Sequence, residues 1–158
     1  MIVFDLQGQS KSEALIYTPH GIPASSSVIN LLTSPQSHLN PPISFLALLH
    51  GLHEVYVGGP QINLGGFNGA ALVQKLKIKY WIRTHDEIKN GSGLIGKVLS
   101  RKVVGWDEAL GLDSNGDEKG SSGDGADGVK LKAGGAEDNN NEVVEFVKIG
   151  NGECMVLE

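Results

Sequence analysis

The sequence predicts an α/β fold, in which a mixed β-sheet packs with two or three helices. Short apolar runs rich in Val, Ile and aromatic residues recur along residues 1–110, and such runs favour strands. Between residues 43 and 102 these runs alternate with segments of helical periodicity, an order typical of α/β sandwiches. A long acidic stretch then interrupts the pattern before a final apolar segment at residues 142–158.

The first part of the chain is rich in strand signals. The segments "MIVFDL" at 1–6 and "EALIYTP" at 13–19 flank a polar turn, which predicts a β-hairpin. The segment "SSVINLLT" at 26–33 predicts a third strand between Ser- and Pro-containing loops. The apolar run at 43–52 fits either a buried strand or a helix, and residues 54–59 fit a brief strand or a loop.

The middle of the chain alternates helix and strand signals. Residues 69–77, "GAALVQKLK", predict a helix that Asn68 caps. The run "KIKYWIRT" at 77–84 predicts a strand, and "GLIGKVLSRK" at 93–102 predicts another short helix. Near the C-terminus, residues 142–158 alternate apolar and polar side chains around a Gly-Asn-Gly turn, which predicts a closing β-hairpin.

Residues 113–141 differ sharply from the rest of the chain. Seven acidic residues against three lysines give this stretch a local charge of −4, out of −5 for the whole chain. Few side chains other than Val129 and Leu131 are apolar there, so the stretch is expected to be disordered. The predicted organisation is a domain at 1–110, an acidic insertion at 111–141 and a closing hairpin of the same domain at 142–158.

Composition excludes several classes of function. The chain has no basic cluster suited to a nucleic-acid backbone and no apolar run long enough to span a bilayer. The N-terminus lacks the basic flank and apolar core of a secretory signal. A single cysteine, Cys154, excludes an internal disulfide and fits a reducing compartment. We therefore expect a soluble cytoplasmic protein.

His85 and His20 are the candidate metal ligands. His85 follows the predicted strand at 77–84, and His20 follows the strand that Pro19 ends. A ligand just past the carboxyl end of a strand is held rigidly while the loop admits water, as an α/β metal site requires. Each histidine also has a purely structural interpretation. His85 would lie in a capped turn at Thr84–Glu87, and His20 would be a loop histidine fixed by Pro19.

Other motifs carry less weight. His50 and His53 are three residues apart, but they are more typical of core or surface histidines than of ligands. Asp113–Asp124 imitates a calcium loop, yet Glu118 stands where that loop needs Gly, so the match is attributed to chance. The Gly-rich stretch at 58–69 lacks a phosphate-loop motif and the dinucleotide spacing, and it is interpreted as a loop that packs closely near a site.

The segments "ALIYTPHG", "LLHGL", "NLGGFNGAALVQKL" and "YWIRTHDEIKNGSGL" together resemble the second half of a metallo-β-lactamase superfamily domain, in its fungal, lactonase-like branch. The resemblance covers residues 1–110 and resumes in the closing hairpin. It implies half of an αββα sandwich and a metal-dependent hydrolase. In complete relatives, one or two zinc ions activate a hydroxide, which hydrolyses an ester, lactone or phosphodiester bond of a small-molecule substrate.

By this resemblance, His85 matches the family's last metal-binding histidine, and His20 falls where the family ends a strand with a bridging ligand. Asp86 and Glu87 belong to the motif without a metal role. The family's His-x-His-x-Asp-His group is absent from these 158 residues. Because a catalytic zinc needs about three protein ligands, we expect a truncated hydrolase that is inactive alone.

An alternative function is a non-enzymatic interaction module. If half of the sandwich is missing, one sheet face should expose apolar side chains to water, namely Val3, Ile16, Ile29 and Leu46. That face would then associate with a second copy or with another chain.

Overall fold

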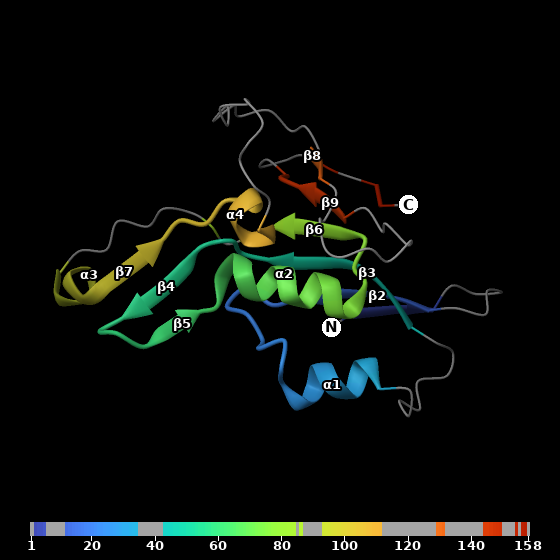
Figure 1. The fold of residues 1–158 in the computed structure, drawn as a ribbon, viewed down its shortest axis with the longest axis horizontal. Coiled ribbons are helices and arrows are strands. Elements are labelled where there is room, and N and C mark those ends of the chain that lie inside the picture. The colour runs from blue at the N-terminus through green and yellow to red at the C-terminus, as the bar shows by residue number, and fades with distance from the viewer. Residues whose placement is uncertain are drawn as a thin grey trace.

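The computed structural model of the protein describes residues 2–5, 12–34, 43–84, 86, 93–111, 129–131, 144–149, 154 and 156–157. These residues form two sheets and four helices, in the order that Figure 1 colours from blue to red. The strands are β1 (Ile2–Asp5), β2 (Ser12–Tyr17), β3 (Ile43–His50), β4 (Glu54–Val57), β5 (Gln61–Asn63), β6 (Tyr80–Arg83), β7 (Leu99–Lys102), β8 (Val129–Leu131) and β9 (Val144–Val147). The helices are α1 (Ser27–Thr33), α2 (Gly65–Leu76), α3 (Gly93–Val98) and α4 (Trp106–Leu110).

The larger sheet is mixed, and the predicted α/β class is confirmed. Its strand order is β1-β2-β3-β6-β9-β8. Strands β2, β3, β6 and β9 run parallel to one another, whereas β1 pairs antiparallel with β2 and β8 pairs antiparallel with β9 at the two ends. The expected pairing of the first two strands is therefore correct. The run at 43–52, which fitted strand or helix, is a central strand as far as His50, with apolar side chains on both faces, as parallel sheets require.

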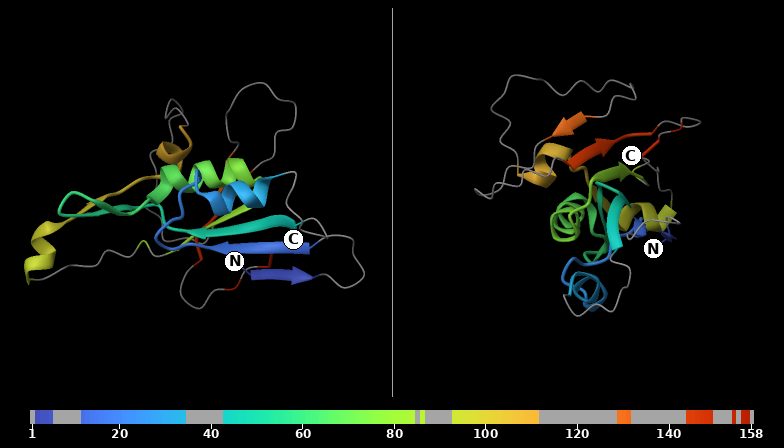
Figure 2. Two further views of the ribbon diagram at one scale, coloured as in Figure 1. Left: turned by 90° about the horizontal axis from the view of Figure 1, so that it is seen from below. Right: turned by 90° about the vertical axis from the view of Figure 1, so that its right-hand side faces the viewer.

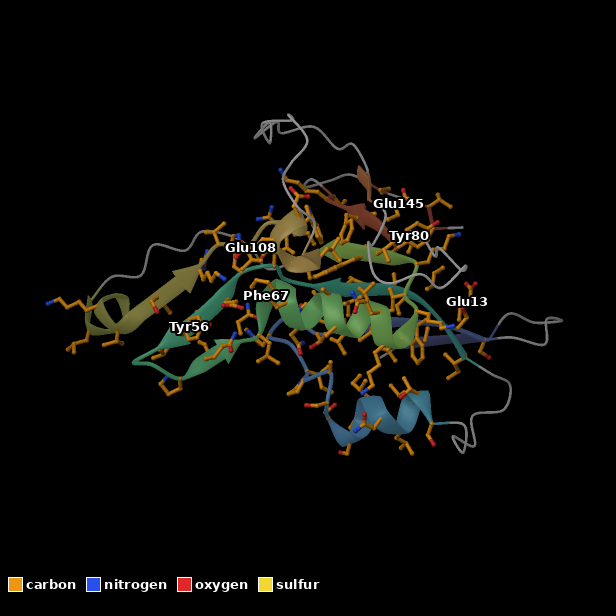
Figure 3. The ribbon with its side chains drawn as sticks, viewed as in Figure 1. Glu13, Tyr56, Phe67, Tyr80, Glu108 and Glu145 are labelled. Atoms are coloured by element: carbon orange, nitrogen blue, oxygen red, sulfur yellow. The ribbon has the colours of Figure 1, made fainter. Side chains whose placement is uncertain are left out.

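The smaller sheet is an antiparallel arm of three strands in the order β5-β4-β7, with α3 between β6 and β7 in the chain. Figure 1 shows this arm extending away from the larger sheet, starting where β3 passes into β4. At its base the Lys102 ammonium lies 4.6 Å from the ring centroid of Phe67 and 3.0 Å from Oε1 of Glu108. Figure 3 labels Phe67 and Glu108 on this side of the arm.

The main core lies between one face of the larger sheet and the helices. Figure 2 shows α1 and α2 on the same side of that sheet. Helix α2 contacts the sheet through residues one turn apart, including Gly69, Leu72, Val73 and Leu76. Trp81 at the centre of β6 is fully buried and its ring packs against those of Trp106 and Phe146.

Residues 26–33 form a helix, so the predicted third strand is wrong. Ser26 is the N-cap, and its hydroxyl accepts a hydrogen bond from the backbone N–H of Ile29 at 3.4 Å. Ile29 and Leu32, three residues apart, both pack into the main core. This helical spacing was present in the sequence but was outweighed by the Val and Ile content of a short run.

Two helix assignments also need correction. Helix α2 begins at Gly65, before the predicted start, and Asn68 lies inside it instead of capping it. The Asn68 side chain binds another segment, because it accepts from Ala24 N–H at 3.1 Å and donates to the Ile22 carbonyl at 2.8 Å. The predicted helix at 93–102 is helical only as far as Val98, and its second part is strand β7.

The prediction that apolar side chains are exposed to water is wrong for Ile16 and Ile29. Ile16 of β2 is 6% exposed and Ile29 is 1% exposed, because Ile29 lies in helix α1 and both side chains pack into the main core between the helices and the sheet. Leu46 is half-buried, with Leu15 and Leu49, against a smaller apolar cluster on the opposite face. The side chain of Val3 lies outside the described residues.

The C-terminal part differs from a simple hairpin. Strand β9 pairs with β6 and β8, and the described residues after 149, Cys154, Val156 and Leu157, lie outside any strand. Strand β8 falls within the predicted acidic insertion, and the disorder of the remaining insertion stays a prediction because those residues lie outside the described ones. The calcium-like segment Asp113–Asp124 also lies outside them.

Gly69 sets how closely α2 approaches the sheet. A Cβ at this position would lie 2.2 Å from Cζ2 of Trp81 and 2.6 Å from Cδ2 of His50, both in buried rings. The change Gly69→Ala gains about 1 kcal/mol of helix propensity but overpacks the core by about 3 kcal/mol. We expect a net loss of about 2 kcal/mol in the free energy of unfolding, measured by urea denaturation.

The matched control is Gln74→Ala on the exposed side of α2, which should change stability by less than about 0.5 kcal/mol. Equal stability of the Gly69→Ala variant and the unmodified chain would contradict this packing.

Candidate functional site at the carboxyl edge of the parallel strands

Three chain segments meet where β2, β3 and β6 end. Because these strands are parallel neighbours, their carboxyl ends lie at one edge of the sheet, with Tyr17 opposite Leu49 and His50 opposite Arg83. Figure 1 shows this edge where β6 points toward α4 and the arm begins. In open α/β sheets this is the edge at which ligands bind.

The ring of His50 joins three of the elements at this edge. Its Nδ1 lies 2.7 Å from the carbonyl oxygen of Thr18, just after β2, and its Nε2 lies 2.8 Å from that of Gly65, at the start of α2. The backbone carbonyl of His50 accepts from Nε1 of Trp81 at 3.1 Å. His50 is completely buried, and a backbone oxygen occupies each ring nitrogen. Neither nitrogen is therefore open to a metal ion.

The carboxylate of Asp86 ties the end of β6 to the end of β3. Its Oδ1 accepts from the backbone N–H groups of Leu52 and His53, both at 2.9 Å, and its Oδ2 accepts from Leu52 N–H at 2.8 Å. Arg83 Nε donates to Oδ2 at 2.9 Å. The Asp86 side chain is only 4% exposed. The carboxylate is thus occupied by backbone donors and by one guanidinium.

Gly51 makes room for this contact. A Cβ at Gly51 would lie 2.9 Å from the carbonyl oxygen of Thr84 and 3.0 Å from Oδ1 of Asp86. Residues at the end of β6 therefore pack directly on the backbone that follows β3. Gly51, in the segment between His50 and His53 that was considered as a weak metal motif, is the residue that permits this close approach.

His53 is buried next to the same carboxylate. Its Nε2 lies 3.5 Å from Nη2 of Arg83, and its Nδ1 lies 3.8 Å from Oδ1 of Asp86. Among the described residues Nδ1 has no hydrogen-bond partner. The pKa of His53 is lowered, mainly because burial disfavours the charged ring; Asp86 opposes this effect, whereas Arg83 and Arg101 add to it.

Of the two predicted metal ligands, the structure describes His20 but not His85. His20 is exposed at this edge, where its backbone carbonyl accepts from Leu64 N–H at 3.1 Å. His85 lies outside the described residues, but Thr84 and Asp86 on either side of it both contact the loop after β3. Residues 18–21 therefore lie at the same sheet edge as residues 84 and 86. Both groups of residues contact the chain at the carboxyl end of β3. In the described part of the chain no group of three or more His, Cys, Asp or Glu is placed to hold a metal ion.

Sequence reasoning missed the roles of Asp86 and Arg83. The alternative of a capped turn expected Asp86 to bind the backbone of its own turn, whereas it binds N–H groups 33 and 34 residues earlier. A carboxylate directly after a strand was the available signal, but only the folded chain identifies its donors. The Gly-rich stretch predicted as a loop contains strand β5 and the start of α2 instead. Its α2 end does lie close to the site, since Gly66 N–H donates to the Leu52 carbonyl at 2.7 Å.

No family model, curated protein or solved structure matches this chain. No helix within the described ranges has the length and apolar character needed to cross a membrane. The site is therefore characterised by its own geometry.

The change Asp86→Ala should destabilise the fold. It leaves two backbone N–H groups without their acceptor and removes the ion pair of Arg83, which together cost about 3 kcal/mol. Asp86→Asn keeps one acceptor oxygen and should lose about half of that. Urea denaturation measures both, and Asp107→Ala, an exposed carboxylate in α4, is the control, with an expected loss below about 1 kcal/mol. Equal losses at 86 and 107 would contradict the role of Asp86.

Stability should fall as the pH drops below the ordinary pKa of histidine. Because the pKa of folded His53 lies below 6.5, the unfolded chain binds a proton that the folded chain does not. The free energy of unfolding should decrease from pH 6.5 down to the lowered pKa, with no contribution from His53 above this window. Urea denaturation across it should give a shallower slope for His53→Gln, and identical slopes would refute the assignment.

Proposed function

We propose that this chain forms part of a metal-dependent hydrolase of the metallo-β-lactamase type, in which His85 and His20 are zinc ligands. The observation that carries the proposal is the meeting of the segments after β2, β3 and β6 at one sheet edge. Residues that lie far apart in the sequence can contribute to one site there. The proposed substrates are small esters, lactones or phosphodiesters.

The donors available at this edge limit what the chain can do alone. His50 and Asp86 are occupied by backbone groups and by Arg83, so they do not add to the ligand set. His20 and His85 make at most two ligands, and a catalytic zinc needs about three with an open position. Bound zinc would supply an activated water molecule. We assign no catalytic step to this chain, because its residues do not complete that centre.

The expected result of a calorimetric zinc titration is weak binding, without turnover of ester or lactone substrates. Replacement of His85 by Ala should abolish this binding, and His20→Ala should weaken it, because each removes one imidazole ligand. The matched control is His38→Ala, which changes a histidine between α1 and β3 in the sequence.

Sub-micromolar binding accompanied by hydrolysis would overturn the expectation of inactivity. Zinc binding that is the same in all three variants would overturn the ligand assignment.

A second candidate function is an interaction module without enzymatic activity. It is favoured by the face opposite the helices, where Leu15, Leu46 and Leu49 are only half-buried and Tyr17 is 56% exposed. Association through this face would bury these side chains. A stable dimer in light scattering, together with no zinc binding, would favour this candidate over the hydrolase.

A further inference from the structure

The face of the larger sheet opposite the helices has an apolar cluster of its own. Its buried centre consists of side chains from the neighbouring strands β3, β6 and β9, namely Ala47, Tyr80, Ile82 and Val147. Tyr80 and Ile82 flank Trp81 of the main core, so strand alternation places them on the other side of the sheet. Residues of α1, α2 and α4 belong to the main core and do not cover this second cluster.

Leu157 packs against this second cluster from outside the sheet. It belongs to no strand, yet its side chain is half-buried against the cluster. The neighbouring Val156 is 81% exposed. Of residues 154, 156 and 157, which the structure describes, Leu157 alone belongs to an apolar cluster. The part of the chain after β9 therefore returns to this face of the sheet and contacts it through one leucine among these residues.

Leu157 covers the face only in part. Leu15, Leu46 and Leu49 around the cluster are half-buried, and Tyr17, two residues after Leu15 in β2, is 56% exposed. A single half-buried leucine is a weak anchor, but the chain between β9 and Leu157 is short. Such a covalent tether holds a segment at an effective concentration on the order of millimolar. A second molecule in dilute solution has to compete with that concentration for the same face.

We propose that the segment around Leu157 is the chain's own cover for this apolar face and closes it to a second copy of the chain. A contact between two copies needs only this one patch, because twofold symmetry pairs a surface with itself. Release of Leu157 is then the step that permits the copies to associate. The association rests on the second candidate function, whereas the cover requires neither that function nor a metal ion.

The single cysteine of the chain, Cys154, gives a direct test of the cover, because it is exposed and close to Leu157 in the sequence. A nitroxide spin label on Cys154 should broaden the methyl NMR signals of Leu15, Leu46 and Leu49. Leu157→Asp places a charge against an apolar cluster, which is costly, and should release the segment. The broadening should then be lost.

Light scattering over a concentration series tests the competition with a second copy. Leu157→Asp should lower the Kd of the dimer at least about tenfold, because the face is then open in every copy. Leu157→Ala removes most of the same contact without adding a charge, and it keeps the test valid if the Asp variant fails to fold. It should change the broadening and the Kd in the same direction.

The matched control is Val156→Asp, which adds the same charge at the adjacent position, where the side chain is 81% exposed. It should leave both the broadening and the Kd of the dimer as they are in the unmodified chain.

The inference is overturned if the label broadens none of these signals in the unmodified chain, if Leu157→Asp and Val156→Asp behave alike, or if release of Leu157 leaves the chain monomeric. Failure of the proposed functions looks different. Calorimetry with zinc decides the hydrolase without reference to Leu157. A dimer of the unmodified chain that lacks the broadening would support the interaction module and overturn the cover.

Discussion

The contact between the Asp86 carboxylate and the backbone after β3 is the constraint on which the arrangement of the site depends. The edge of a parallel sheet leaves N–H groups without partners where each strand ends, and burying such groups unpaired is costly. Asp86 accepts those of Leu52 and His53 and is itself held by Arg83. A single side chain therefore sets the path of two loops and the direction in which Arg83 points.

His50, at the same sheet edge as Asp86, is a second buried polar side chain that joins distant backbone segments. The ring nitrogens lie within hydrogen-bonding distance of the carbonyl oxygens of Thr18, just after β2, and of Gly65 in α2, while the backbone carbonyl of His50 accepts from Trp81. These contacts are compatible only with a close approach of α2, which Gly69 permits. Packing and polar satisfaction thus act together here. The histidines nearest the core support the fold, whereas His20 is exposed.

The arrangement of charge at the edge follows from this polar framework. The Asp86 carboxylate accepts backbone N–H groups of Leu52 and His53 and also pairs with the Arg83 guanidinium, so the two side-chain charges compensate each other at this edge.

The sequence by itself determined the α/β class, the strand that contains residues 80–83 and the helix over residues 69–76, because these depend on local apolar periodicity. It left the run at 43–52 open between strand and helix, and it placed the start of α2 too late. It misplaced residues 26–33, where strand-favouring side chains lie at helical spacing and burial of Ile29 decided the conformation. Only the tertiary structure decided that Asp86 binds the loop after β3 and that His50 bridges β2 and α2. These partners are 15 to 34 residues away in the chain, and no local pattern specifies which distant backbone group a buried polar side chain will meet.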